Sequence, residues 1–354
     1  MPAPEHPGLD LGFAGYPLQL RLKEEVLRDA ARRAGVALPD RDLSVRPSPH
    51  VWGYRSAVQP AVRRGRLGYR RAGSDDVVPL DADPTAMPSV NEAWRALAAA
   101  GLPGDVREVA LRGNDRGEAL AALVADVPAR ELLDLGHRLV GAGLAGVALA
   151  PWDPRGRFRA GKRRLAGART IPQRYGRYTF SVSATAFAQP NPEAAGALAT
   201  EAADLTPGGT QACELFAGGG LLAFHLAERY QDVVAIEIAR ESVDRGRHDA
   251  ERAGLEHVRF ERADARRVGL PGADLIAVDP PRSGLAKDLR AAIDASAARH
   301  LLYVSCDVAT WARDVADLAR RGWRLEEVRP FDLQPHTHHL ELASLLARPG
   351  GQVS

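Results

Sequence analysis

The pattern of hydrophobic and polar positions changes near residues 190–200. Beyond that point, short apolar runs alternate with amphipathic stretches long enough to form helices. The runs predict strands at 212–216, 233–236, 258–261, 275–278, 301–304, 325–328 and 340–346. The stretches between them predict helices at 221–229, 240–253, 287–298 and 310–321. Such alternation is typical of a parallel, doubly wound α/β sheet, and we predict one over residues 193–354.

The part of the chain before residue 193 has a less regular pattern. Helical spacing occurs at 18–35, 91–102 and 128–141, whereas 106–111 and 121–124 suit strands. The segment 51–80 indicates several short strands, and Pro60 argues against a central strand there. We therefore predict an N-terminal domain of mixed α/β type over residues 1–192.

Composition places the chain among ordinary globular proteins. Of its 354 residues, 45% are apolar and 26% are charged, and the formal net charge is only +2. The two cysteines, Cys213 and Cys306, are too few for a disulfide scaffold or a four-thiolate iron–sulfur cluster. Residues 1–4 show no signal-peptide pattern, and no apolar run reaches the roughly 18 residues of a membrane span. We therefore expect a cytoplasmic protein.

The first three strands of the predicted sheet end in residues suited to a nucleoside. In open α/β sheets, ligands bind outside the carboxyl ends of the strands. The first strand runs into the turn Glu214–Gly220, whose glycines let a ligand approach the backbone, but whose spacing is not that of a pyrophosphate-binding turn. Glu237 ends the second strand and suits ribose hydroxyls, and Asp264 follows the third and suits an adenine amino group. Together they predict a nucleoside cofactor without a pyrophosphate.

The next two strands end in residues suited to chemistry. Asp279 is followed by two prolines, which stiffen the turn and fix its direction. Cys306 lies at the end of the fifth strand, directly before a predicted helix, and we expect the helix N-terminus to lower the pKa of its thiol. Cys213 lies within a predicted buried strand, and we expect it to be an inert core residue.

A histidine-rich segment precedes the last strand. His336, His338 and His339 raise the question of zinc, but no cysteine or carboxylate pair completes a familiar ligand set, and we expect no metal. Glu341 begins the last strand and is expected to face the same edge as Cys306.

These motifs together resemble the RNA uracil-5-methyltransferases, a family with enzymes for transfer RNA and for large-subunit ribosomal RNA. The resemblance is dense in the catalytic half and weak before it. It rests on Phe187–Asn191, Glu214–Gly220, Asp279–Arg282, Ser305–Asp307 and His336–Glu341, with weaker matches at Trp52–Arg55, Gly68–Arg71 and Pro79–Leu80. It implies a Rossmann-like class I methyltransferase fold, S-adenosylmethionine as cofactor, and 5-methyluridine in RNA as product.

The resemblance also implies roles for individual residues. Cys306 would be the nucleophile and Glu341 the general base. The cofactor and base pocket would be lined by Gln189, Phe216, Gly220, Glu237, Asp264 and Asp279. The family often has asparagine where this chain has Gly220, and commonly has asparagine where it has Asp307. Some relatives carry an iron–sulfur cluster and others an N-terminal barrel domain. We expect neither here, because there are only two cysteines and the segment before Gly15 is short.

The chemistry explains why these groups are needed. Addition of a thiolate to carbon 6 of uracil makes carbon 5 nucleophilic enough to attack a sulfonium methyl group. A base must then remove the proton from carbon 5 before the thiolate leaves. The target base must also leave any stack to reach the pocket.

Two basic runs lie outside the predicted catalytic half. Residues 155–177 hold nine Arg or Lys and no acid, and residues 46–71 hold seven arginines and no acid. The interleaved aromatic residues are Phe158, Tyr175 and Tyr178 in or beside the first run and Trp52, Tyr54 and Tyr69 in the second. Charge combined with aromatic faces suits loop or single-stranded RNA, which predicts an RNA-recognition domain. We also expect the protein to be a monomer. We favour 23S rRNA over tRNA as the substrate. The alternatives are a non-catalytic RNA-binding or chaperone protein and a methyltransferase for small molecules or proteins.

Overall fold

The computed structural model describes residues 6–153, 158, 161–267, 269–270 and 272–348. Contacts divide the chain into two compact units. Unit 1 comprises the described residues up to Phe13, then His50–Arg174 and Ser181–Pro192. Unit 2 comprises Ala14–Pro49, Tyr175–Phe180 and the described residues from Glu193 on. The expected boundary after residue 192 therefore recurs between Pro192 and Glu193, but two earlier segments lie in the other unit from the one expected.

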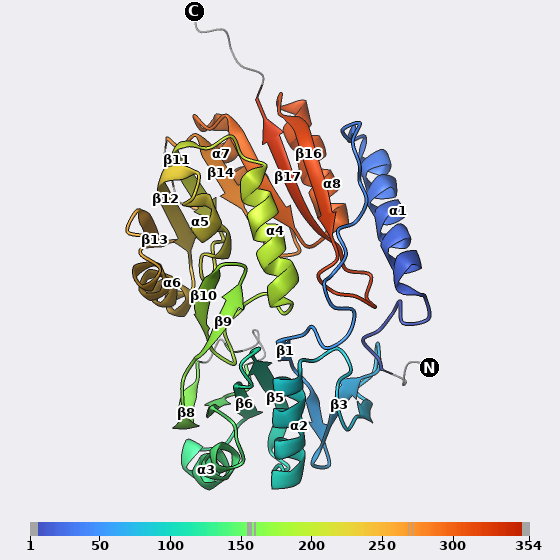
Figure 1. Ribbon diagram of the computed structural model, residues 1–354, viewed down its shortest axis with the longest axis vertical. Helices are drawn as coiled ribbons and strands as arrows, with labels where there is room; N and C mark the ends of the chain where they lie inside the picture. The colour runs from blue at the N-terminus through green and yellow to red at the C-terminus, as the bar shows by residue number, and fades with distance from the viewer. Residues whose placement is uncertain (1–5, 154–157, 159–160, 268, 271, 349–354) are drawn as a thin grey trace, which may run out of the picture. The chain divides into compact units, whose positions relative to one another are not determined.

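Unit 2 is built on a mixed seven-stranded sheet in the order β13-β12-β11-β14-β15-β17-β16 (Figure 1). Its strands are β11 (Gly209–Leu215), β12 (Tyr230–Glu237), β13 (Val258–Arg262), β14 (Leu275–Val278), β15 (His300–Ser305), β16 (Arg324–Phe331) and β17 (Glu341–Ala347). Its helices are α1 (Tyr16–Ala34), α4 (Pro192–Asp204), α5 (Leu221–Leu226), α6 (Arg240–Arg252), α7 (Lys287–Ala295) and α8 (Val308–Arg320). All seven predicted strands are present.

The sheet departs from the expected parallel arrangement at one edge. The strands from β13 to β15 pair in parallel, but β17 is antiparallel to both β15 and β16. The reversal has a direct consequence, because the first residue of β17 lies at the edge of the sheet where β15 ends. Ser305 of β15 pairs with Leu342 of β17.

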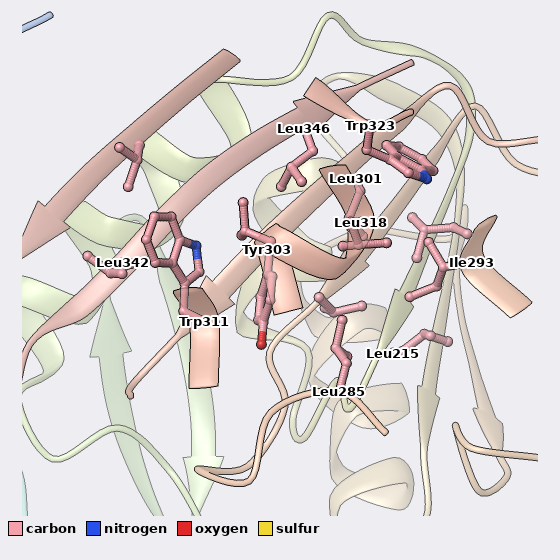
Figure 2. Close-up of a cluster of buried hydrophobic side chains, with 14 of the residues drawn as sticks. Leu215, Leu285, Ile293, Leu301, Tyr303, Trp311, Leu318, Trp323, Leu342 and Leu346 are labelled. Atoms are coloured by element: carbon pink, nitrogen blue, oxygen red, sulfur yellow. The ribbon is translucent and has the colours of Figure 1, made fainter. Parts of the chain in front are cut away.

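The core of unit 2 includes side chains from α1, α7 and α8. Figure 2 shows part of it, including Ile293 of α7 and Trp311 and Leu318 of α8. Helix α8 shows why: Val308, Trp311, Ala312, Val315 and Leu318 recur at helical spacing and are all buried. The indole of Trp311 donates a hydrogen bond to the Ser344 hydroxyl (3.0 Å), which ties the helix to β17.

Helix α1 belongs to this core although it was expected in the N-terminal domain. It contacts α8, and its Leu27 and Ala31 are part of the same buried cluster. The helix has proline in its first turn and ends at Gly35, whose φ of 71° is left-handed.

Unit 1 is a mixed α/β body, as expected. Its sheet has the order β4-β3-β2-β5-β6-β7-β8, and β1 also pairs with β5 (Figure 1). The strands are β1 (Ala57–Val58), β2 (Ala61–Arg63), β3 (Arg66–Arg70), β4 (Val77–Pro79), β5 (Val106–Gly113), β6 (Ala119–Ala125), β7 (Gly146–Ala150) and β8 (Arg163–Gly167). The helices are α2 (Pro88–Ala100), the 3-10 turn η1 (Ala129–Leu132) and α3 (Leu133–Gly141). Helices α2 and α3 contact each other and the sheet, around a core that includes Trp94, Leu123 and Leu139.

A two-stranded hairpin completes the fold. Its strands are β9 (Ile171–Tyr175) and β10 (Tyr178–Val182), whose residues are shared between the two units. Across the described ranges, we find no helix long and apolar enough to cross a membrane.

Candidate active site

The carboxyl edge of the unit 2 sheet brings together the residues expected to perform chemistry. Cys306 follows β15 directly, Asp279 follows β14, and Glu341 begins the reversed strand β17. The pairing of Ser305 with Leu342 sets Cys306 and Glu341 at the same end of the two adjacent strands. The expectation that Glu341 faces the edge of Cys306 is therefore met by a strand running against its neighbours.

Electrostatic interactions show that these three groups are coupled. Burial, followed by the charges of Glu341 and Asp279, raises the pKa of the Cys306 thiol to about 11, against a lowering by Arg282. Burial and the charge of Asp279 raise the pKa of Glu341 to about 8, and burial raises the pKa of Asp279 to about 7. Their protonated forms are therefore favoured relative to isolated groups, and the titration of each depends on the others.

The raised pKa of Cys306 overturns the expectation that the helix N-terminus would lower it. The carboxylate of Asp307 caps α8 by accepting a hydrogen bond from the Thr310 N–H (2.8 Å). A negative charge already occupies the positive end of the helix. Asparagine and aspartate are similar caps, so Asp307 in place of asparagine preserves this turn.

Glu341 is poised as an acid–base group by its surroundings. Its side chain is buried, with 3% of its surface exposed. Its Oε2 atom has no hydrogen-bond partner among the described residues. A buried carboxyl oxygen without a partner favours the protonated form and is available to a ligand.

The glycine turn after β11 has a backbone that few side chains permit. Phe216, Gly218 and Gly220 have φ angles of 63°, 55° and 88°, all in the left-handed region. A Cβ atom at Gly220 would lie 2.5 Å from the ring of Phe260. This contact and the left-handed φ account for glycine at position 220.

Glu237 supports this turn. Its Oε2 atom accepts a hydrogen bond from the Gly218 N–H (2.9 Å) and its Oε1 atom accepts one from the Ala239 N–H (2.7 Å). Each oxygen retains a lone pair that can accept a further hydrogen bond, which is compatible with the predicted contact to ribose hydroxyls.

Asp264 is engaged more fully than expected. Arg266 donates to it from Nε (3.0 Å), a terminal guanidinium nitrogen (2.9 Å) and the backbone N–H (3.1 Å). These bonds hold the pKa of Asp264 below its ordinary value. A contact to an adenine amino group would share oxygens that already bind Arg266.

Gln189 has a different position in the chain from the other predicted pocket residues. It belongs to unit 1, whereas Phe216, Gly220, Glu237 and Asp279 belong to unit 2. Its role at the cofactor remains a prediction.

The histidine-rich segment serves separate contacts. The backbone N–H of His336 donates a hydrogen bond to the Oε1 atom of Gln19 (2.8 Å). Arg282 lies 2.8 Å from the Nε2 atom of His339. Within the described residues, no three His, Cys, Asp or Glu side chains are grouped so that they could hold a metal ion.

Two features of the site were missed in the sequence. Glu214 is buried inside the sheet, and burial together with the charge of Asp279 raises its pKa well above the ordinary value. Helix α1 holds the loop before Glu341: Lys23 pairs with Asp332 (2.6 Å), and both are almost fully buried. The row Gln19, Lys23, Leu27, Ala31 at four-residue spacing was the available signal, since it marks one helix face.

Most aromatic residues expected to meet RNA are structural instead. Tyr54 and Tyr175 are each only 2% exposed. Tyr69 donates a hydrogen bond to Asp83 (2.6 Å), and Tyr178 donates one to Glu228 (2.8 Å). Trp52 is the exception among these, with 45% of its surface exposed.

The fold and the site together define a class of α/β enzyme. Its features are a glycine-rich turn suited to a nucleoside cofactor and a thiol beside buried carboxyl groups. Within that class, the chain belongs to the tRNA (uracil-5-)-methyltransferase family, whose sequence pattern matches residues 168–349. It is therefore an RNA methyltransferase by family.

Individual relatives agree with this assignment. The chain is 32% identical to the 23S rRNA (uracil(1939)-C(5))-methyltransferase RlmD of Alkalilimnicola ehrlichii, over 93% of this chain and 78% of the relative. It is 31% identical to an uncharacterized RNA methyltransferase of Thermosynechococcus vestitus, over 94% of this chain and 80% of the relative. Among solved structures, the tRNA (uracil-54, C5)-methyltransferase of Pyrococcus abyssi in complex with S-adenosyl-L-homocysteine shares the fold, with a TM-score of 0.80 and 24% identity over 97% of this chain and 86% of that one.

Proposed function

We propose that the protein transfers a methyl group from S-adenosylmethionine to carbon 5 of a uridine in RNA, through a covalent adduct between Cys306 and carbon 6. The observation that carries this proposal is the pairing of β15 with the reversed β17, which sets a thiol and a buried carboxyl group at one edge of the sheet. The family relationship and the names of the relatives support the same reaction.

The carboxyl groups gathered at the carboxyl edge of the unit 2 sheet suit a cationic cofactor. Burial and the charge of Asp279 raise the pKa values of Glu214 and Glu341, so a positive charge beside these carboxyl groups would be stabilised. S-adenosylmethionine supplies such a charge, together with the methyl group. Gly218, Gly220 and Glu237 form a turn that allows close approach and offers oxygen acceptors.

The residues then divide the work in the following way. The Cys306 thiol loses its proton, and its sulfur forms a bond to carbon 6 of the uracil. Asp279 has a pKa of about 7 and is a competent acceptor for that proton near neutrality. Carbon 5 takes the methyl group, whose bond to the sulfonium sulfur breaks with its electron pair left on that sulfur. Glu341 has a pKa of about 8 and must be ionised for the next step, and a cation bound beside it would lower that pKa. Ionised Glu341 takes the proton from carbon 5, the electrons of that C–H bond form the double bond between carbons 5 and 6, and the bond from sulfur to carbon 6 breaks with its pair returning to Cys306, which regains a proton from Asp279.

For the substrate, we propose 23S rRNA, with tRNA as the alternative. The relative RlmD acts on 23S rRNA by its name, which favours the first. The name of the family favours the second. We further propose that the protein works as a cytoplasmic monomer.

The test compares the two cysteines. Methyl incorporation from labelled S-adenosylmethionine into total RNA is measured for Cys306→Ala and for Cys213→Ala. We expect the first variant to lose turnover by at least about 10³-fold, and the second to retain it, since Cys213 is a core residue that is 0% exposed. Normal turnover in Cys306→Ala would show that the mechanism is wrong. Mapping of 5-methyluridine in cells with and without the gene distinguishes 23S rRNA from tRNA.

A further inference from the structure

Unit 1 contains a pocket away from the residues considered so far. Its volume is about 400 Å³, within the range of roughly 300–1,000 Å³ typical of sites for small ligands. The residues that line it come from β6, from β7, from 162–164 and 168–169 in and beside β8, and from 183–185. Strands β6 and β8 are labelled in Figure 1. All these residues belong to unit 1.

The charge of this pocket is strongly positive. The polar side chains that line it include Lys162, Arg163, Arg164 and Arg169, and its described lining contains no acidic residue. The three arginines are exposed. In the described part of the chain, none of the three forms an ion pair with a carboxylate. Unpaired guanidinium groups around a hollow favour an anionic ligand.

Two hydroxyl groups at the pocket contact its lysine. The Lys162 ammonium donates hydrogen bonds to the hydroxyls of Ser183 (2.8 Å) and Thr185 (3.0 Å). Ser183 is itself buried, with 2% of its surface exposed. These bonds hold the ammonium at the wall of the pocket, beside the three exposed arginines.

The types of residue that line the pocket indicate which part of a nucleic acid it can bind. The strand residues Ala121, Gly146 and Ala148 carry at most a methyl group, so a ligand can approach the sheet closely. No aromatic ring is among the described lining residues, which removes the usual means of stacking a base. The pocket therefore suits the phosphate and ribose of a nucleic acid better than a base.

The other basic run does not offer an equivalent site. Arg70 pairs with Glu108 (2.7 Å), Arg66 lies 3.8 Å from Asp81, and Arg46 lies 3.4 Å from Glu201. Much of that positive charge is therefore already compensated within the protein.

We infer that this pocket, which we call the unit 1 basic pocket (Lys162, Arg163, Arg164, Arg169, Ser183 and Thr185), binds the sugar–phosphate backbone of the RNA substrate. The inference rests on the proposed function for the identity of that substrate. Backbone contacts position RNA and supply affinity but do not read sequence. The pocket therefore sets how tightly the RNA binds and not which uridine is methylated.

The experiment uses the full chain and two triple variants with the same loss of charge. The pocket variant is Arg163→Gln/Arg164→Gln/Arg169→Gln. The control is Arg95→Gln/Arg130→Gln/Arg138→Gln, which removes three exposed arginines from the helices of unit 1. Fluorescence anisotropy measures the Kd for a 23S rRNA hairpin that contains the target uridine, and for a scrambled RNA of equal length, from 50 to 300 mM KCl.

We expect the pocket variant to bind both RNAs about 10- to 100-fold more weakly than the control. The slope of log Kd against log salt should fall by about 2, because three phosphate contacts contribute about 0.7 each for single-stranded RNA. The single variant Arg169→Gln, in the short exposed link between β8 and β9, should lower the slope by about 0.7. At saturating RNA, kcat of both triple variants should match that of the unchanged protein.

Three results would overturn the inference: equal affinity of the pocket and control variants, an unchanged salt slope, or weakening confined to the RNA with the target sequence. The proposed function fails by a different result, namely methylation that persists in Cys306→Ala. If the pocket variant still methylates RNA at saturating concentration but binds RNA no more weakly than the control, the inference about the pocket is wrong and the proposed function is unaffected.

Discussion

The basic pocket of unit 1 and the carboxyl edge of the unit 2 sheet differ in the sign of their charged groups and in how far those groups are exposed to solvent. In unit 1, exposed arginines around the pocket have no carboxylate partner among the described residues. In unit 2, Glu214, Asp279 and Glu341 are brought together in partly or fully buried positions, and their pKa values rise. Uncompensated surface cations suit a polyanion that binds and leaves. Crowded, buried carboxyl groups suit proton transfer and a cationic cofactor.

The two arrangements also differ in their effect on the free energy of folding. Exposed charges are solvated, so the pocket arginines add little to the free energy of folding in either direction. Buried charges must be paired or neutralised by protonation. Unit 2 uses both solutions: Lys23 pairs with Asp332, and Glu341 holds a proton at neutral pH. A change in a buried charge should therefore have a larger effect than a change in the pocket.

The largest effect is expected for Glu341→Gln. Without its general base, the enzyme can form the adduct but cannot remove the proton from carbon 5, so turnover should fall by about 10²–10⁴-fold. A covalent complex between protein and RNA should then accumulate, visible as a shifted band on a denaturing gel. The matched control is Glu326→Gln on β16, which substitutes the same residue type away from the site. An absence of the band, with turnover still low, would assign Glu341 to a step before adduct formation.

A smaller but still large effect is expected for Lys23→Met, now on stability. The substitution leaves Asp332 as an unpaired buried charge, and breaking such a pair costs about 3–5 kcal/mol. Arg21→Met removes an exposed cation from the same helix and should change the free energy of unfolding by less than about 0.5 kcal/mol. Urea denaturation of both variants measures the difference. If Lys23→Met and Arg21→Met have equal effects, α1 does not support the loop before Glu341 as described.

Much of the fold follows from local pattern, whereas much of the site does not. The strand–helix alternation predicts every strand of unit 2, because each buried strand is a short apolar run. The antiparallel direction of β17 depends on which edge it pairs with, and no local pattern encodes that choice. The position of α1 in unit 2 was missed for a similar reason. Lysine is typical of exposed positions, and nothing local in the sequence indicates that Lys23 is buried and paired with Asp332.

The position of Glu341 and the pKa of Cys306 both depend on how strands pair. Glu341 lies at the edge of Cys306 because β17 is antiparallel to β15, whereas in a fully parallel sheet the first residue of this strand would lie at the opposite edge. The thiol pKa was predicted in the wrong direction, because its direction depends on two carboxyl groups that come from other strands. Tyr54 and Tyr69 were expected to contact RNA, but Tyr54 is buried and the Tyr69 hydroxyl donates a hydrogen bond to Asp83, neither of which the local pattern indicates.

The pH dependence of stability should sharpen the contrast between the two units. Glu341 has a pKa of about 8 in the folded protein against an ordinary value of 4.5, so the folded state binds more protons between these values. Its contribution is fully present below pH 4.5 and is lost as the pH rises through about 8. Urea denaturation between pH 5 and 9 should show stability decreasing with pH, and the decrease should be smaller in Glu341→Gln. Equal slopes in the two proteins would mean that Glu341 has an ordinary pKa.

The smallest effect is expected for Asp307→Asn, which tests why the thiol pKa is high. Asparagine can accept the same hydrogen bond from the Thr310 N–H, so the free energy of unfolding should change by less than about 0.5 kcal/mol. The substitution removes the negative charge from the N-terminus of α8, and the dipole of the helix then acts on Cys306. The pKa of Cys306 should therefore fall by less than about one unit, since burial and the charges of Glu341 and Asp279 remain as its main causes. The rate of alkylation by iodoacetamide against pH measures it, with Cys213→Ala as the background so that only one thiol reacts. An unchanged pKa would mean that the cap at Asp307 does not oppose the helix, and that burial and the two carboxyl groups alone account for the thiol.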